Sequence, residues 1–426
     1  MDIEVICTGD EVLTGKIVNS NFSYITQKLE DYGFGVRRGI TVGDDRAELL
    51  DAFRKAGERN DVVIVNGGLG PTVDDLSQEI AAEAAGVGLV LEEAWVERME
   101  AFFRRLGRTM PPNNRKQAML PAGAELIDNP IGTACGFGVK IGRATFYFTP
   151  GVPRELRRML EEQLLPRMLE KSGRRDVILL RRFHSYGLGE SHVDAMLGDV
   201  EAMVPDGSVK LGFRAHYPQL ETKLTVRASS MEEAESKLKP VIAEVEKRMG
   251  NFILARDNET LEGVIQAAML ERGATLATVE DYTGGQLAAR LAAVEGMDGY
   301  FSRGIVVPTL QAKHDAFELR GVELEPIPSY EMVEAMAQEV RALAGTTHGL
   351  AVLVGVTDAG GRRGTLEATI CIAIADENGV VARRSRNNGN HDWVRLGAVE
   401  MGLDSVRRHL QGLPLKEQTD FERKDG

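Results

Sequence analysis

Cysteine is scarce in this chain of 426 residues, and long apolar runs are missing. The three cysteines, Cys7, Cys135 and Cys371, form no CxxC metal pair and are too few and too widely spaced for a disulfide framework. No run approaches the roughly 18 apolar residues of a membrane span. The residues from Met1 to Val5 lack the basic and apolar regions of a signal peptide. We therefore expect a cytoplasmic protein without a membrane partner.

Positive charge is also in short supply, with 51 Lys and Arg against 64 Asp and Glu and a net charge of −13. Nucleic-acid binders need clustered Lys and Arg to neutralise phosphates, so we expect no nucleic-acid partner. The seven histidines show no HExxH or other ligand spacing, and no GxGxxG motif occurs. The segment from Gly9 to Lys16 has one residue too many for a Walker A loop, and Ile17 stands where Ser or Thr should bind Mg²⁺.

Strands and helices alternate over the first 172 residues. Short apolar runs at 3–7, 61–66 and 145–149 predict strands. The run 61–66 is β-branched without polar alternation, as expected of a central parallel strand buried on both faces. The pattern predicts an α/β domain with a three-layer αβα sandwich, whose loops gather at the carboxyl ends of the strands.

The rest of the chain predicts two further domains and a tail. A polar stretch at 170–176 indicates a linker, and residues 173–252 read as a small α+β module. Residues 253–413 predict a second α/β domain, whose last helix has an apolar face formed by Trp393, Leu396, Val399, Leu403, Val406 and Leu410. Residues 414–426 form a polar tail that we expect to be disordered.

A glycine-rich loop carries the strongest functional signal. It reads Gly67-Gly68-Leu69-Gly70-Pro71-Thr72-Val73-Asp74-Asp75 and follows a predicted strand. Glycine lets backbone amides approach an anion, and a helix expected from about Asp74 adds its positive end. Acids beside an anion need a cation between them, and carboxylates are usual Mg²⁺ ligands. A tight turn with an acidic helix cap is the alternative, and composition alone leaves both open.

Three further loops are predicted at the same edge of the sheet, at 8–11, 42–45 and 150–155. A single acidic loop is most often a solvated turn. Several loops that converge on a glycine cradle are typical of the ligand site of an open α/β sheet.

Five motifs make the chain resemble the CinA (competence/damage-inducible protein) family along nearly its whole length. They are TGDEVLTGKIVNSN (8–21), GGLGPTVDD (67–75), NNRKQAMLP (113–121), NPIGTACG (129–136) and TPGVPREL (149–156). The resemblance implies a molybdopterin-binding-like first domain, similar to pyrophosphatases that cleave ADP-ribose to AMP and ribose 5-phosphate with a divalent metal. It also implies a KH-like linker domain, a spacer or dimer contact here, and a homodimer.

The third domain resembles nicotinamide mononucleotide deamidases but departs from their pattern. The family motif ESCTGG, with its nucleophilic serine, is replaced by EDYTGG at 280–285, which places Asp281 at the serine. Pro308 replaces the family's tyrosine, although the lysine remains as Lys313, and the TGIAGP loop is altered at 354–359. An aspartate lacks the hydroxyl that becomes the acyl-enzyme oxygen, so we expect an inactive deamidase.

The resemblance and the loops together predict a metal-dependent hydrolase of a nucleotide diphosphate, with ADP-ribose as the expected substrate. A non-catalytic nucleotide- or pterin-binding or scaffold protein is the alternative, and deamidation through the third domain is a further one. The cofactor expected is a divalent metal (Mg, Mn or Co), with a monovalent cation as an optional addition. The expected catalytic residues are Asp75, Asp74, Lys116 and Asp45, and the expected metal ligands are Asp10, Asp45 and Asp75. The expected substrate-binding residues are Gly9, Asp10, Glu11, Asn19, Asn21, Gly67, Gly68, Leu69, Gly70, Thr72, Asn114, Arg115, Gly132, Thr133, Pro150, Gly151, Pro153 and Glu155.

Overall fold

The computed structural model describes residues 1–173, 176–317, 319, 321–358 and 365–422. The chain divides into two compact units, Met1–Ile178 and Leu179–Gly426. In the described ranges, no helix is both long and apolar enough to cross a membrane.

The first unit is built on a six-stranded sheet of order β2-β1-β3-β8-β7-β6. Four neighbouring strands run parallel: β2 (Val36–Val42), β1 (Ile3–Thr8), β3 (Val62–Asn66) and β8 (Ala144–Thr149). Strand β7 (Gly136–Ile141) pairs antiparallel with β8, and β6 (Glu125–Ile127) pairs antiparallel with β7 at the edge of the sheet. All five residues of β3 are buried, which confirms a central strand covered on both faces.

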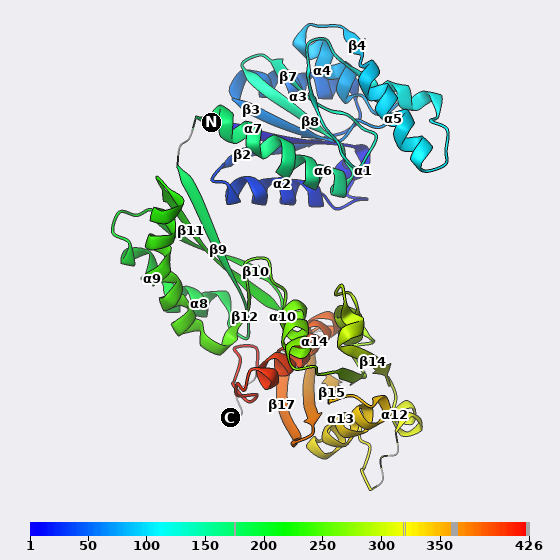
Figure 1. Ribbon diagram of the computed structural model, residues 1–426, viewed down its shortest axis with the longest axis vertical. Helices are drawn as coiled ribbons and strands as arrows, with labels where there is room; N and C mark the ends of the chain where they lie inside the picture. Colours follow the sequence, from blue (N-terminus) through cyan, green and yellow to red (C-terminus); the bar gives the residue numbers. More distant parts are fainter. Residues whose placement is uncertain (174–175, 318, 320, 359–364, 423–426) are drawn as a thin grey trace. The chain divides into compact units, whose positions relative to one another are not determined.

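Helices cover both faces of this sheet (Figure 1). Side chains that alternate along β1 enter two different cores: Ile3 and Val5 pack with one set of helices and Ile6 with the other. One layer holds α2 (Ser20–Asp31), α6 (Pro153–Met159) and α7 (Leu165–Ser172). The other holds α3 (Arg46–Arg59), α4 (Ser77–Ala85) and α5 (Glu93–Arg105). The predicted three-layer α/β sandwich is therefore confirmed.

Short elements complete the first unit. They are α1 (Asp10–Leu13), the paired strands β4 (Leu89–Leu91) and β5 (Met119–Pro121), a 3₁₀ helix (Pro112–Ala118) and a π-helical turn (Leu160–Leu164) between α6 and α7. The predicted linker at 170–176 starts inside α7, which ends at Ser172, while residues 174–175 lie outside the described part.

The helix expected from Asp74 begins three residues later, at Ser77. The Thr72–Asp75 pair, which has the spacing of a capping box, forms a separate turn instead. The Asp75 carboxylate accepts hydrogen bonds from the backbone N of Thr72 at 2.8 Å and from its Oγ1 at 2.6 Å. The loop therefore continues through this turn, and α4 begins only after it.

The second unit begins with an α+β module, as predicted. Its sheet has the order β10-β11-β9-β12, formed by β10 (Val209–His216), β11 (Gln219–Ala228), β9 (Val177–Tyr186) and β12 (Ile253–Arg256). Helices α8 (Glu190–Leu197) and α9 (Met231–Met249) share its apolar core. Strand β12 pairs with β9 and so belongs to this sheet, although it follows the predicted boundary at residue 252.

A five-stranded sheet of order β14-β13-β15-β16-β17 follows in the second unit. Its strands are β13 (Leu276–Glu280), β14 (Phe301–Val306), β15 (His348–Asp358), β16 (Leu366–Asp376) and β17 (Gly379–Gly389). The helices are α10 (Leu261–Glu271), α11 (Gln286–Ala292), α12 (Leu310–Ala316), α13 (Tyr330–Ala344) and α14 (His391–Leu410). Helix α13 packs against one face of the sheet, and helices α10 and α14 pack against the other.

The apolar face predicted for the last helix is partly exposed, and the expected disorder of the tail is wrong. Trp393 and Leu396, at the start of that face, are 49% and 41% exposed. Trp393 stacks on Tyr217 of the α+β module, with ring centroids 3.9 Å apart. The tail is ordered over its described residues, 414–422: Asp420 accepts hydrogen bonds from the backbone N of Gly189 at 2.8 Å and pairs with His192. The expected disorder is thus replaced by packing, while residues 423–426 lie outside the described part.

Candidate functional site

A pocket of about 640 Å³ opens at the carboxyl ends of the parallel strands in the first unit. Its walls include Thr8 at the end of β1, Asn66 at the end of β3 and Pro150 just after β8. Strand β1 lies between β2 and β3, so the strand order reverses at β1. Ligands of open α/β sheets bind at such a switch point.

An asparagine network fixes the loops that form the pocket. The Asn21 Nδ2 donates to Asn66 Oδ1 at 2.9 Å and to the Gly151 carbonyl at 2.7 Å. The Asn66 Nδ2 donates to the Pro150 carbonyl at 2.7 Å and to Thr149 Oγ1 at 3.2 Å. Both asparagines are buried, so these bonds are made away from competing water. The network ties the loops after β1, β3 and β8 into one preorganised wall.

The glycine loop takes a conformation that other residues resist. Gly67 and Gly68 have φ of +113° and +68°, and a Cβ on Gly68 would lie 2.3 Å from the Ser77 hydroxyl. In the described part of the chain, no hydrogen bond is recorded from the backbone amides of Gly68, Leu69 and Gly70. These three amides, predicted as anion donors, are thus uncommitted beside the pocket.

Thr8 is the clearest sign of a missing partner. Its side chain is 6% exposed and lines the pocket, and its Oγ1 has no hydrogen-bond partner among the described residues. A buried hydroxyl without a partner costs free energy on the order of 1–3 kcal/mol. A ligand that bonds to Thr8 would recover that cost.

Acidic side chains dominate the electrostatics of the pocket. Glu11, Asp44, Asp74 and Asp75 line it, and none of its lining residues in the described ranges is Lys or Arg. Burial and the negative charges of Asp10, Glu11 and Asp74 raise the pKa of Asp44 above its ordinary value. Burial likewise raises the pKa of Glu155, although a 2.7 Å hydrogen bond from Asn129 opposes the shift. The pocket therefore has a negative rim that a cation would relieve.

Most of the predicted site residues come together here. Those that line the pocket are Gly9, Glu11, Asn19, Asn21, Gly67, Gly68, Leu69, Gly70, Thr72, Asp74, Asp75, Thr133, Pro150, Gly151, Pro153 and Glu155. Four further residues that were not predicted as site residues also line the pocket: Thr8, Asp44, Asn66 and Gln117. Asn66 ends a buried strand directly before the glycine loop, and that position was a usable signal.

Six other predicted site residues are not part of the pocket lining and have structural contacts instead. Asp45, predicted to be catalytic and a metal ligand, caps α3 by accepting from the backbone N of Ala47 and Glu48, both at 2.9 Å. Lys116 donates to the Thr72 carbonyl at 2.9 Å, and Arg115 pairs with Glu93 at 3.2 Å.

The remaining three predicted site residues also lie outside the pocket lining. Asn114 donates to Gln117, Gly132 packs against the Glu155 carboxylate, and Asp10 bonds to Asp44. Asp10, Asp45 and Asp75 do not converge as a ligand set within 4.8 Å of one another among the described residues.

The altered loop of the third domain holds a buried ion pair. The Asp281 Oδ2 accepts from the Lys313 Nζ at 2.8 Å, and both side chains are more than nine-tenths buried. The Asp281 Oδ1 accepts from the backbone N of Val354 at 2.9 Å. The carboxylate at the expected nucleophile position is thus satisfied by the protein itself. The altered segment 354–358 continues strand β15, and Ala359 lies outside the described residues.

The neighbouring Glu280 has a structural role. Its carboxylate is fully buried and accepts from the backbone N of Gly285, Leu287 and Ala288 at 2.9–3.1 Å. A carboxylate at the start of α11 offsets the helix dipole and satisfies its first amides. Glu280 therefore holds the loop in shape, and Asp281 faces Lys313.

The fold and the pocket define a multidomain α/β protein whose first domain is of the molybdopterin-binding type. Residues 4–170 match a family described as a probable molybdopterin binding domain, 180–255 match the damage-inducible protein CinA KH domain, and 258–410 match the CinA C-terminal domain. A CinA-like protein from Shewanella loihica is 38% identical over 419 residues, 97% of each chain. The chain belongs to the CinA family.

The chain is also similar to a second full-length relative and to a solved structure. A nicotinamide-nucleotide amidohydrolase from Shewanella oneidensis is 35% identical over 418 residues, 96% of each chain. The crystal structure of the protein CinA, of unknown function, from Thermoplasma acidophilum is 36% identical, with a TM-score of 0.35; the match covers 40% of this chain and 96% of that one.

The Shewanella oneidensis relative corrects the predicted activity. The expectation of an ADP-ribose pyrophosphatase is wrong, because this relative is named as a nicotinamide-nucleotide amidohydrolase and residues 258–410 of this chain match the CinA C-terminal domain. The family thus includes an enzyme, with a different reaction from the one expected.

Proposed function

We propose that the amino-terminal domain binds a phosphorylated heterocycle, a pterin or a nucleotide, in the pocket at the ends of β1, β3 and β8. The observation that carries the proposal is the buried Thr8 hydroxyl, which lies beside the glycine loop and has no hydrogen-bond partner within the described ranges. The uncommitted amides of Gly68, Leu69 and Gly70 suit a phosphate group. The match of this domain to a molybdopterin-binding family supports a ligand with a flat ring system.

A divalent cation, such as Mg²⁺, fits the acidic rim of this pocket. Glu11, Asp44 and Asp74 line one cavity, and their mutual repulsion contributes to the raised pKa of Asp44. Because these carboxylates do not form a ligand set within 4.8 Å in the described part of the chain, they suit a hydrated cation better than a chelated one. When bound, the cation would reduce the repulsion between the rim and the phosphate of the ligand.

Thr8→Val tests this proposal, because the two side chains have nearly the same shape. The variant should bind adenosine 5′-monophosphate, or a phosphorylated pterin, about tenfold more weakly in calorimetric titrations with Mg²⁺, since one hydrogen bond is lost. Its thermal stability should not fall, because the hydroxyl has no hydrogen-bond partner in the part of the chain that the structure describes. Thr26→Val on α2, which lies outside the pocket lining, is the matched control. Failure of wild-type protein to bind either ligand would refute the proposal.

Hydrolysis of the amide of a nicotinamide nucleotide is the second candidate, favoured by the named activity of the Shewanella oneidensis relative. Its test is ammonia release from nicotinamide mononucleotide, with that relative as the positive control. We expect a far lower rate here, because Asp281 provides no hydroxyl for an acyl-enzyme and its carboxylate is held by Lys313. A rate comparable with the relative's, lost in Asp281→Asn, would establish this candidate and assign the chemistry to the carboxylate.

A further inference from the structure

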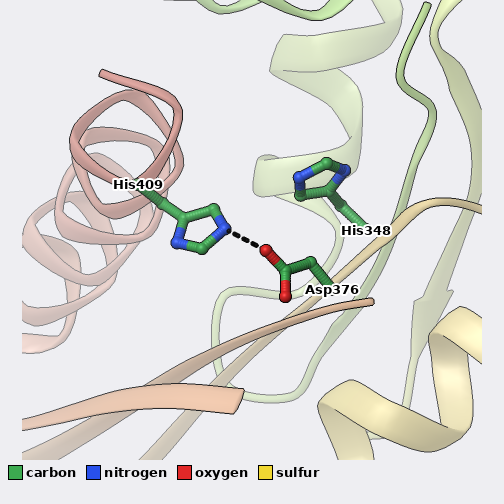
Figure 2. Close-up of side chains that lie close together, drawn as sticks. All are labelled: His348, Asp376 and His409. Carbon is green, nitrogen blue, oxygen red and sulfur yellow. Dashed lines mark hydrogen bonds and ion pairs between the residues drawn. The ribbon is translucent and has the colours of Figure 1, made fainter. Parts of the chain in front are cut away.

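Three potential metal ligands meet at one end of the third-domain sheet (Figure 2). His348 is the first residue of β15, Asp376 is the last of β16, and His409 lies in the final turn of α14. One ligand atom from each lies within 4.8 Å of the other two, and the His409 Nε2 is 3.1 Å from the Asp376 Oδ2. All three are partly buried and line a cavity of about 360 Å³.

Sheet register brings these residues together although they are distant in sequence. Strands β15 and β16 are antiparallel, with Gly349 opposite Ala375, so the next pair along the ladder is His348 and Asp376. Helix α14 packs against both strands and supplies His409. On the parallel neighbour β13, His348 is level with Leu276, while Asp281 follows the other end of that strand. The cluster is therefore separate from the Asp281–Lys313 pair.

A hydrogen-bond network orients His348. The Thr347 Oγ1 accepts from the backbone N of Thr275 at 2.7 Å and donates to the Thr275 carbonyl at 2.9 Å. With its only proton used, Thr347 can contact the His348 Nδ1, 2.8 Å away, only as an acceptor. The Nδ1 then carries the ring proton, and the lone pair lies on Nε2. Metal-binding histidines are usually fixed in this way by a second hydrogen bond.

The aspartate is held in a similar way. The Asp376 Oδ1 accepts from the backbone N of Asn378 at 2.7 Å, which leaves Oδ2 facing His409. The carboxylate is thus positioned with one oxygen turned toward the two imidazoles.

We propose that His348, Asp376 and His409 form a site for a divalent transition-metal cation, with Zn²⁺ as the best fit. Two imidazoles and one carboxylate are borderline ligands that suit this class of metal and not Mg²⁺ or Ca²⁺. Ligand atoms around a tetrahedral Zn²⁺ lie roughly 3.3 Å apart, given bonds of about 2.0–2.1 Å. The ligand atoms of the three residues now lie within 4.8 Å of one another, and small side-chain rotations would bring them to that tetrahedral spacing. Three protein ligands would leave a fourth position for water or a small anion, and the cavity that these residues line gives access to them.

Zinc titration of the full-length chain, purified without a histidine tag, tests the site. In competition with a chromophoric chelator, wild-type protein should bind one Zn²⁺ per chain tightly. His348→Ala and His409→Ala should each weaken that binding at least about tenfold. His314→Ala removes a histidine that is exposed on α12 and should bind as wild type does. Thr347→Val, which keeps all three ligands, should weaken binding by disturbing the orientation of His348.

A folding control keeps the result interpretable. Asp376→Asn preserves the size of the side chain and should fold, while Zn²⁺ should raise the melting temperature of wild-type protein but not of this variant. The proposal is overturned if wild-type protein and the double variant His348→Ala/His409→Ala bind Zn²⁺ equally. It is also overturned if Asp376→Asn gains as much thermal stability from Zn²⁺ as wild type does.

Discussion

Replacing Asp281 by alanine is expected to destabilise the third domain by about 3–5 kcal/mol, because Lys313 is left as an unpaired buried charge. The backbone N of Val354 also loses its acceptor. For a domain of this size the melting temperature should fall by on the order of 10 °C. The chain has two tryptophans, Trp95 in the first unit and Trp393 in α14. In a Trp95→Phe background, fluorescence then reports unfolding of the second unit, in which Trp393 of the third domain stacks on Tyr217 of the α+β module.

A double variant separates the unpaired charge from other effects. Asp281→Ala combined with Lys313→Met removes both charges and should be more stable than Asp281→Ala alone, because no buried charge remains unpaired. Asp281→Asn keeps an acceptor for Val354 and should fall between wild type and the alanine variant. If Asp281→Ala unfolds at the wild-type temperature, the buried ion pair does not stabilise the third domain and this prediction is wrong.

Replacing Asn66 by leucine is expected to disrupt the first domain, with a loss of about 2–4 kcal/mol. The change removes hydrogen bonds to Asn21, Thr149 and Pro150 and leaves their buried polar groups without partners. Because the same bonds hold the loops of the pocket, affinity for the phosphorylated ligand should fall as well. Trp95 in a Trp393→Phe background reports unfolding of this domain, since its Nε1 donates to the Thr133 carbonyl beside the pocket.

The exposed Asn113→Leu is the matched control, because it makes the same chemical change outside the pocket lining. It should leave the unfolding midpoint within about 0.5 kcal/mol of wild type, as surface substitutions usually do. An Asn66→Leu variant as stable as this control would show that the asparagine network does not organise the pocket.

The sequence by itself determined the layers of the first domain and the family. The β-branched run that became β3 is buried throughout, and a strand buried on both faces requires helices on both sides of a parallel sheet. Glycines at 67 and 68 indicated a loop with positive φ, and both adopt it. These inferences succeed because burial periodicity and glycine conformation are local properties that neighbouring residues set.

Only the tertiary structure decided which side chains meet. Asp44 and Asp45 look equivalent in sequence, yet the first lines the pocket and the second caps α3. The tail was expected to be disordered, but its Asp420 pairs with His192 in a distant module. His348 and His409 show no ligand spacing, because sheet register and helix packing bring them together. Such contacts depend on how separate helices and strands pack together, and a local pattern of residues does not predict that packing.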